Sequence, residues 1–346
     1  MLRQCFPYFR LIFRKQMWSR GSRFGAPRPA TNRRKIEMLR HVIAFALAGT
    51  FLIGVTSTAS AEVRFGVLAP RGEAVAYEAW TELGIYLTDQ IGEPVTIVPL
   101  PPTQSLYFLG NRHLDFLLSN PVQSAIAQEV YKATPVVSLA KRSGTQFAGV
   151  IVTRRDSGIV AAQQLRGKRV LSMRVGVAAG GYIFQTYYLE QRGIRVPGDL
   201  ASLEEGKNQD ELVIGVRDGL ADAAFVRTGV LEAMASAGRI SLDDFTVVDE
   251  RHEGFPLMHT TPLYPEWMAM AGPTVDPALT ARVRTALLSL RAGDLAARAA
   301  NINGFLEPVS LVEMKAALAA LRIPPFDTLV QESESQGTTG TEGPSS

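Results

Sequence analysis

Short apolar segments alternate with amphipathic segments from residue 63 to residue 321, and this order constrains the fold most strongly. The apolar segments are rich in β-branched residues, which is typical of strands. We predict strands at 63–68, 95–100, 114–118, 136–140, 147–153, 170–173, 223–226 and 245–248. Between residues 73 and 91, apolar side chains recur at the spacing of one helical face, at Tyr77, Trp80, Leu83, Leu87 and Ile91. The alternation predicts an α/β fold in which a mainly parallel sheet is flanked by helices.

The series of predicted strands and helices restarts after Leu165. Two series in a chain of this length indicate two lobes with a cleft between them. In open α/β sheets, ligands bind beyond the carboxyl ends of the strands, where helix N-termini converge. We therefore expect the binding site at the joins between strands and helices.

Several predicted helices carry start signals. Asn120-Pro121 and Asp276-Pro277 each place a capping side chain before a proline in the first turn. Asn208 and Ser310 are each followed three residues later by Glu, which is the form of a capping box. A loop at Gly180-Gly181 is expected to open a further helix.

Residues 38–61 have the organisation of a secretory signal peptide. Residues 42–55 are apolar, and Ala59-Ser60-Ala61 presents small residues at the cleavage positions. The apolar stretch is shorter than the roughly 20 residues that span a bilayer, so we favour cleavage over an uncleaved anchor. The arginine-rich residues 1–37 leave two interpretations open: a true start at Met38, or a long positively charged n-region.

The composition changes when residues 1–61 are set aside. Residues 62–346 keep 25 basic and 32 acidic side chains, a net charge of −7, which argues against nucleic-acid binding. The single cysteine, Cys5, precedes the cleavage site, so the exported part has no disulfide, cysteine nucleophile or lipid-accepting cysteine. We expect a monomeric periplasmic protein that is not lipid-anchored and needs no cofactor or metal. Residues 331–346, rich in Ser, Gly, Thr and Glu, are predicted to be a disordered tail.

Three joins between a predicted strand and a predicted helix are candidate anion sites, at 119–121, 178–181 and 227–229. Each presents free backbone N–H groups at a helix start, and these groups with the helix dipole favour an anion. Glycine permits close approach of a ligand to the backbone, and an arginine offers a bidentate contact. The candidate residues are Asn120, Gly180, Gly181, Tyr182, Arg227 and Thr228. Capping residues occur at most helix starts, so each join taken alone also fits a structural role.

Four further residues complete the candidate set. His259 and Thr260 lie where the chain is expected to cross between lobes, and either residue could form a hydrogen bond to a ligand. His259 also fits the role of a surface or packed residue. Phe147 fits the cleft wall or a buried strand, and Arg71 fits the cleft or the solvent-facing surface. An exported enzyme with His259 as general base is the alternative function. No Gly-x-Ser-x-Gly, His-Glu-x-x-His or Gly-x-x-x-x-Gly-Lys motif supports it, and no residue is predicted to be catalytic.

Seven stretches carry a resemblance that extends over roughly residues 63 to 327. They are RFGVLAPRG (64–72), DFLLSNP (115–121), FAGVIVTRRDS (147–157), LRGKRVLSM (165–173), GGYIFQTYYLEQRGI (180–194), DGLADAAFVRTGVLEAM (218–234) and FPLMHTTPLYPEWMAMA (255–271). In order and spacing they resemble the phosphate/phosphite/phosphonate-binding group of periplasmic solute-binding proteins. They resemble especially the relatives of that group in the sensor regions of tetrathionate-responsive histidine kinases.

The resemblance implies a two-lobed periplasmic-binding-protein fold, type II-like, that closes on a small oxyanion. Lobe I would comprise 62–150 and 262–330 and lobe II 151–261, with crossings near Ile151 and Leu263. The implied ligand contacts are Asn120, Gly180-Gly181, the region of Arg227-Thr228 and the region of His259.

One departure from the family pattern bears on the ligand. Phosphonate binders of this family usually carry Ser and Thr hydroxyls where this chain has Ala178 and Ala179. A phosphonate or phosphite, a sulfur oxyanion, and a carboxylate or sulfonate solute therefore all stay open. The kinase-like relatives continue into a membrane span and a kinase, which this sequence lacks. We expect a separate partner, either an ABC permease or a membrane histidine kinase.

Overall fold

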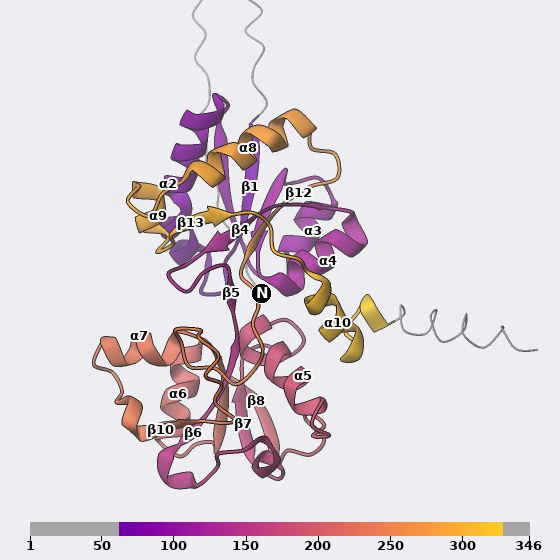
Figure 1. Cartoon of the computed structure of the whole chain (residues 1–346). Coiled ribbons are helices and arrows are strands. Elements are labelled where there is room, and N and C mark those ends of the chain that lie inside the picture. The colour runs from indigo at the N-terminus through magenta and orange to yellow at the C-terminus, as the bar shows by residue number, and fades with distance from the viewer. Residues whose placement is uncertain (1–61, 328–346) are drawn as a thin grey trace, which may run out of the picture. The chain divides into compact units, whose positions relative to one another are not determined.

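The computed structural model describes residues 62–327 (Figure 1). The predicted leader, signal peptide and tail lie outside these residues. The described residues form two main sheets. The strands of the first sheet come from residues 63–140 and 268–306, and those of the second come from residues 149–247. None of the helices in residues 62–327 combines the length and the hydropathy needed to cross a bilayer.

The first sheet has six strands in the order β13-β4-β12-β3-β1-β2. The strands are β1 (Val63–Leu68), β2 (Val95–Leu100), β3 (Phe116–Ser119), β4 (Thr134–Ala140), β12 (Met268–Ala271) and β13 (Gly304–Leu306). Strands β1, β2 and β3 are parallel, whereas β12 runs antiparallel to both β3 and β4. This sheet is therefore mixed rather than mainly parallel, because its last strands come from a segment that returns from the second sheet.

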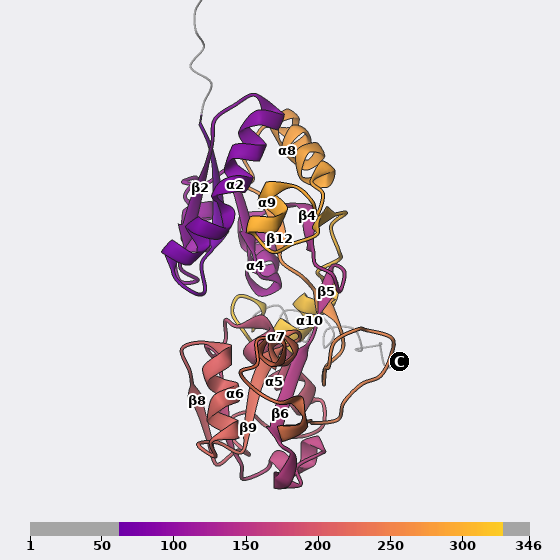
Figure 2. The ribbon, with the colours of Figure 1, turned by 90° about the vertical axis from the view of Figure 1, so that its left-hand side faces the viewer.

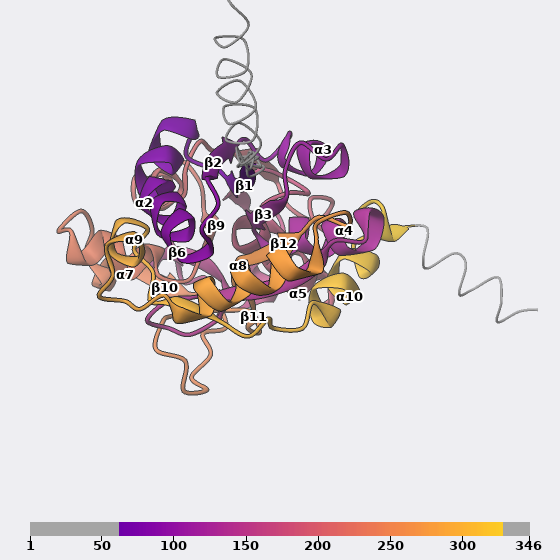
Figure 3. The same cartoon turned by 90° about the horizontal axis from the view of Figure 1, so that it is seen from above.

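Six helices accompany the first sheet. They are α2 (Glu73–Ile91), α3 (Ser105–Gly110), α4 (Pro121–Tyr131), α8 (Pro277–Ser289), α9 (Leu295–Ala299) and α10 (Val312–Ala320). Helices α8 and α9 pack against α2, as the view from above shows (Figure 3). The α2 face buries Trp80, Leu83, Leu87 and Ile91 as predicted. Tyr77 lies outside it, with 56% of its surface exposed.

The second sheet has five strands in the order β10-β6-β9-β7-β8. The strands are β6 (Gly149–Arg154), β7 (Arg169–Ser172), β8 (Ser202–Glu205), β9 (Ala223–Arg227) and β10 (Phe245–Val247). Its helices are α5 (Phe184–Glu190), α6 (Gln209–Arg217) and α7 (Val230–Ser236), and a π-helical turn (Ala179–Ile183) precedes α5. Gly180 and Gly181 lie inside this turn, not in the loop that we predicted.

Two antiparallel segments connect the sheets (Figure 2). The outgoing segment contains β5 (Gln146–Phe147) and the returning segment contains β11 (Tyr264–Pro265), with Tyr264 opposite Phe147. The predicted strand at 147–153 is therefore divided into β5 and β6 at Ala148. Thr260 N and Thr261 N donate to Gly149 O at 2.9 and 3.2 Å. The outgoing and returning segments are therefore hydrogen-bonded to each other beyond the β5–β11 pair as well.

Local start signals agree with the structure. Asn120, Asn208 and Asp276 cap α4, α6 and α8, each accepting a backbone hydrogen bond from two or three residues further on. Ser310 also accepts a bond, from Val312 N at 3.3 Å, although α10 begins one residue later than its capping pattern predicted. Four strands (β8, β11, β12, β13) and α9 have no counterpart among the predicted elements.

Candidate ligand-binding site

A cavity of about 1100 Å³ opens between the two sheets. Its wall comes from the segments that follow β1, β3, β4 and β9, from the outgoing and returning crossings, and from the π-helical turn. The carboxyl ends of strands and the starts of helices therefore meet there, which is where α/β sheets ordinarily bind ligands. We call this cavity the cleft.

The cleft concentrates positive charge. Its wall includes seven cations and three carboxylates: Arg71, Lys141, Arg142, Arg174, Lys207, Arg227 and Arg239, against Glu205, Asp210 and Glu266. This surplus of four positive charges stands in a chain whose residues 62–346 carry a net charge of −7. A concave surface lined by one sign of charge focuses its field and attracts the opposite sign. The cleft is therefore suited to an anion.

Arg227 is one of the cleft cations and is the last residue of β9. Its backbone N donates to Gln209 Oε1 at 2.7 Å, and its guanidinium lies over the Phe147 ring, 4.2 Å from the centroid. Its Nη2 donates to Glu266 Oε1, and the Glu266 side chain is fully buried. Arg227 thus joins the second sheet to the returning crossing, and it already has an anionic partner.

The two glycines of the π-helical turn are required by close packing. A Cβ at Gly180 would lie 2.6 Å from Phe147 Cε2 and 2.9 Å from Arg227 Cβ. A Cβ at Gly181 would lie 2.7 Å from Met173 Cγ. Any larger side chain at Gly180 would displace the ring or the arginine, so the turn can reach the cleft only with glycine there.

Gln185 holds this turn in place, and the sequence reasoning missed it. Its Nε2 donates to Gly180 O at 2.9 Å, Val226 O at 2.8 Å and Val150 O at 3.2 Å. One buried amide therefore connects the π-helical turn to β6 and to the residue before Arg227. A single glutamine inside an apolar helix gives no periodic signal, so only the tertiary contacts identify it.

Seven of the ten predicted site residues line the cleft: Arg71, Asn120, Phe147, Gly180, Gly181, Arg227 and Thr228. Asn120 also caps α4, since its Oδ1 accepts from Gln123 N at 3.0 Å. Thr228 Oγ1 accepts from Ala148 N at 3.3 Å, in the outgoing crossing. Asn120 and Thr228 therefore have structural roles at these joins, and their ligand contacts stay a prediction.

The other three predicted residues are not part of the cleft wall. Tyr182 is buried in an apolar cluster. Thr260 Oγ1 accepts from Ile151 N at 3.0 Å and donates to Val248 O at 2.8 Å, so its hydroxyl is used within the fold. His259 is fully buried, with Nδ1 3.1 Å from Leu257 O and Nε2 3.7 Å from Glu253 Oε1. The proposed general base of an enzyme therefore lies away from the cavity.

Lys141 and Glu266 are cleft residues that the sequence reasoning did not select. Lys141 directly follows β4 and is followed by β5, so it lies at no join between a strand and a helix, which is the feature that selected Arg227. Burial lowers the pKa of the Lys141 ammonium, and the positive charges of Arg227 and Arg71 lower this pKa further. The Glu266 carboxylate acts in the opposite direction and raises it. Glu266 lies in an aromatic stretch between Pro265 and Trp267, where nothing local marks it.

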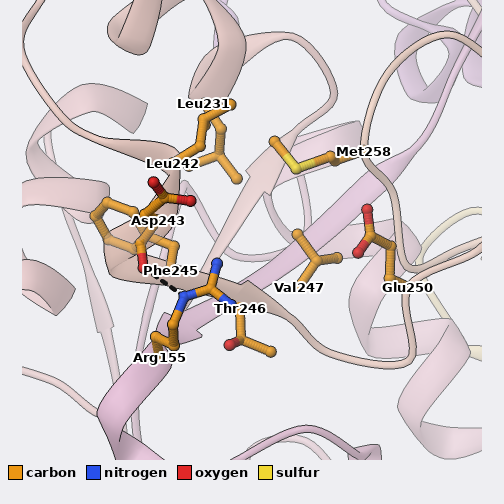
Figure 4. Close-up of a pocket in the computed structure, with 9 residues that line it drawn as sticks. All are labelled: Arg155, Leu231, Leu242, Asp243, Phe245, Thr246, Val247, Glu250 and Met258. Carbon is orange, nitrogen blue, oxygen red and sulfur yellow. Dashed lines mark hydrogen bonds between the residues drawn. The ribbon is translucent and has the colours of Figure 1, made fainter.

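A second, smaller pocket of about 190 Å³ lies beside β10 in the second sheet (Figure 4). Apolar side chains, among them Leu231, Phe245 and Met258, form much of its wall. Arg155 Nε donates to Asp243 O at its edge. None of the predicted site residues lines this pocket.

The fold and the cleft define a two-lobed solute-binding protein of the periplasmic-binding-protein type. Residues 65–310 match the model of a family described as ABC transporter, phosphonate, periplasmic substrate-binding protein, and the chain belongs to this family. The family and fold expected from the sequence are thereby confirmed.

Individual relatives agree with this assignment. The tetrathionate sensor histidine kinase TtrS of Salmonella typhimurium is 34% identical over 233 residues, which are 65% of this chain and 39% of that protein. The chain therefore spans well under half the length of this curated relative.

Among solved structures, XAC2383 from Xanthomonas citri bound to ATP has a TM-score of 0.63 at 20% identity, over 76% of this chain and 98% of that one. PhnD1 from Prochlorococcus marinus in complex with methylphosphonate has a TM-score of 0.62 at 14% identity, over 75% and 98%. At these identities the two structures show a common fold.

Proposed function

We propose that this protein is a periplasmic solute-binding protein that captures a small oxyanion in the cleft. The observation that carries the proposal is the surplus of positive charge on the cleft wall of a chain whose residues 62–346 carry a net charge of −7. Backbone N–H groups at the start of α4 and in the π-helical turn would add donors for the anion. The protein acts by binding and release, without catalysis, and is neither lipid-anchored nor dependent on a metal or cofactor.

The ligand class is a phosphonate, phosphite or sulfur oxyanion. Methylphosphonate is bound by PhnD1, and TtrS is named as a sensor of tetrathionate. Ala178 lines the cleft where phosphonate binders usually offer a hydroxyl, so fewer side-chain donors await a phosphonate there. Sulfur oxyanions are therefore included on equal terms.

Ligand capture would be transmitted by closure of the two sheets about the paired crossings. An anion between Arg227 on the second sheet and the segments of the first would be attracted from both sides, which favours the closed state. The closed surface would be recognised by a separate membrane partner, an ABC permease or a sensor histidine kinase. The predicted boundaries, with residues 62–150 and 262–330 in one lobe and 151–261 in the other, place both hinges at these crossings.

Thermal-shift screening tests the proposal with phosphite, methylphosphonate, sulfite, thiosulfate and tetrathionate, followed by titration calorimetry of each probe that raises the melting temperature. Arg227→Ala is expected to weaken the bound probe at least about tenfold, the value of one charge-assisted hydrogen bond. Arg284→Ala is the matched control, because Arg284 also pairs with a glutamate but is exposed and outside the cleft. A protein whose melting temperature responds to none of the five anions would contradict the proposed function.

A further inference from the structure

Lys141 enters the cleft from a rigid backbone position. Lys141 N donates to Gly144 O and Gly144 N donates to Lys141 O, both at 2.9 Å, which closes a tight turn directly after β4. The neighbouring Ala140 O accepts from Asn303 N at 2.7 Å, so the turn is also tied to the segment that precedes β13. The side chain therefore starts from a fixed point on the cleft wall.

The charges that face Lys141 come from three other segments. Arg71 follows β1, Arg227 ends β9, and Glu266 lies in the returning crossing; Arg142 is its neighbour in the turn. Lys141, Arg71 and Arg227 thus set three positive charges against the single Glu266 carboxylate. Like charges at short range repel one another, and an anion between them offsets this repulsion. Lys141, Arg71, Arg227 and Glu266 therefore form a group with net positive charge, which we call the positive centre.

The cations of the positive centre differ in their hydrogen-bond partners. The Arg227 guanidinium is committed to Glu266 and to the Phe147 ring. Within residues 62–327, the Lys141 Nζ has no hydrogen-bond acceptor. Lys315, by contrast, donates to Glu129 Oε2 at 2.9 Å. An ammonium has three donors, and no acceptor among the described residues takes up those of Lys141, so they are available to a ligand in the cleft.

We propose that Lys141 is a ligand-binding residue of the cleft, the cation whose free donors receive the oxyanion beside the Arg227–Glu266 pair. This inference rests on the proposed function and names one residue of the same site. The anion would supply the missing acceptor and would relieve the repulsion among Lys141, Arg227 and Arg71.

The proposal has a thermodynamic consequence that a structural lysine would not have. A bound anion favours the charged ammonium, so it raises the lowered pKa of Lys141. Binding therefore takes up protons at alkaline pH, and affinity falls as the pH rises through the pKa of the free protein. At lower pH the ammonium is charged in both states, so the proton uptake disappears there.

The experiment uses the full exported chain and calorimetric titration with methylphosphonate and with tetrathionate. Lys141→Met is compared with Lys315→Met, which removes a cation outside the cleft, and with Lys141→Arg, which keeps the charge. Lys141→Met should weaken binding at least about tenfold, Lys315→Met should leave it unchanged, and Lys141→Arg should recover part of the loss. Urea unfolding should show Lys141→Met to be at least as stable as the parent, because a repelled charge has been removed.

Titrations repeated at alkaline pH, in two buffers of different ionisation enthalpy, measure the protons taken up. The parent should take up protons and Lys141→Met should not. If the parent binds a probe but Lys141→Met binds equally well, or takes up the same number of protons, the role of Lys141 is refuted and the proposed function stands. If the parent binds neither these two probes nor the other anions of the thermal-shift screen, the proposed function fails, and the role of Lys141 with it.

Discussion

Replacing Arg227 by methionine would leave the Glu266 carboxylate fully buried without its cationic partner, and with the Trp267 backbone N–H, 3.2 Å from Oε2, as its remaining hydrogen-bond donor within residues 62–327. Removing one member of a buried ion pair typically costs 3–5 kcal/mol, because the remaining charge stays desolvated. Two features favour the lower end of this range: the Arg227 side chain is 22% exposed, and Lys141 is close enough to attract Glu266. We expect Arg227→Met to lower the free energy of unfolding by about 3 kcal/mol.

Urea unfolding of the unliganded protein measures this cost. Trp80 and Trp267 both line the cleft, so tryptophan fluorescence reports on the relevant region. For a domain of this size, about 3 kcal/mol corresponds to a fall of roughly 6–12 °C in the melting temperature. Arg284→Met is the control: its pair with Glu307 is exposed on both sides, and such pairs contribute between about 0 and 1 kcal/mol.

A double-mutant cycle separates the loss of the pair from other effects of the substitution. If the cost comes from the unpaired carboxylate, Arg227→Met combined with Glu266→Gln should be more stable than Arg227→Met alone. Additive losses in the double variant, or a cost below about 1 kcal/mol for Arg227→Met, would refute the reasoning. In either case the Arg227–Glu266 pair would be no more than an exposed ion pair in energetic terms.

Two further predictions concern backbone packing and pH. Gly180→Ala should lower the free energy of unfolding by about 1–3 kcal/mol and should also weaken anion binding, because the added Cβ would collide with Phe147 and Arg227. Gly293→Ala is the control, since no atom lies within 4 Å of a Cβ added there. Unfolding and titration experiments should show no change for it. Burial, with a hydrogen bond from its hydroxyl to Asp249 Oδ2, raises the pKa of Tyr188 to about 12. Since this pKa is above its unfolded value, the stability from Tyr188 is complete below about pH 10 and lost as the pH rises towards about 12. Urea unfolding should show that loss, and Tyr188→Phe should reduce it; an unchanged alkaline slope would count against the assignment.

Local sequence signals predicted much of the fold. The capping roles of Asn120, Asn208 and Asp276 depend on residues two or three positions away, so the sequence contains all the information they need. The buried face of α2 follows from helical spacing in the same way. Tyr77, which we predicted on this face, is exposed because it lies at the edge of the face. Strands β12 (MAMA) and β13 (GFL) were missed because they are short and contain no β-branched residue, so only pairing with distant strands identifies them.

In the candidate site, too, the features that depend on local sequence were predicted, and the features that depend on distant contacts were not. By itself, the sequence determined the alternating α/β order, the family and the joins at which Asn120, Gly180 and Arg227 lie, because these depend on local patterns and on motif order. Only the tertiary structure decided that Arg227 pairs with Glu266, that Lys141 comes close enough to Arg227 and Arg71 for both to lower its pKa, and that His259 lies outside the cleft. Those facts depend on which distant segments the two crossings bring together, and burial and electrostatic interaction arise only after that assembly.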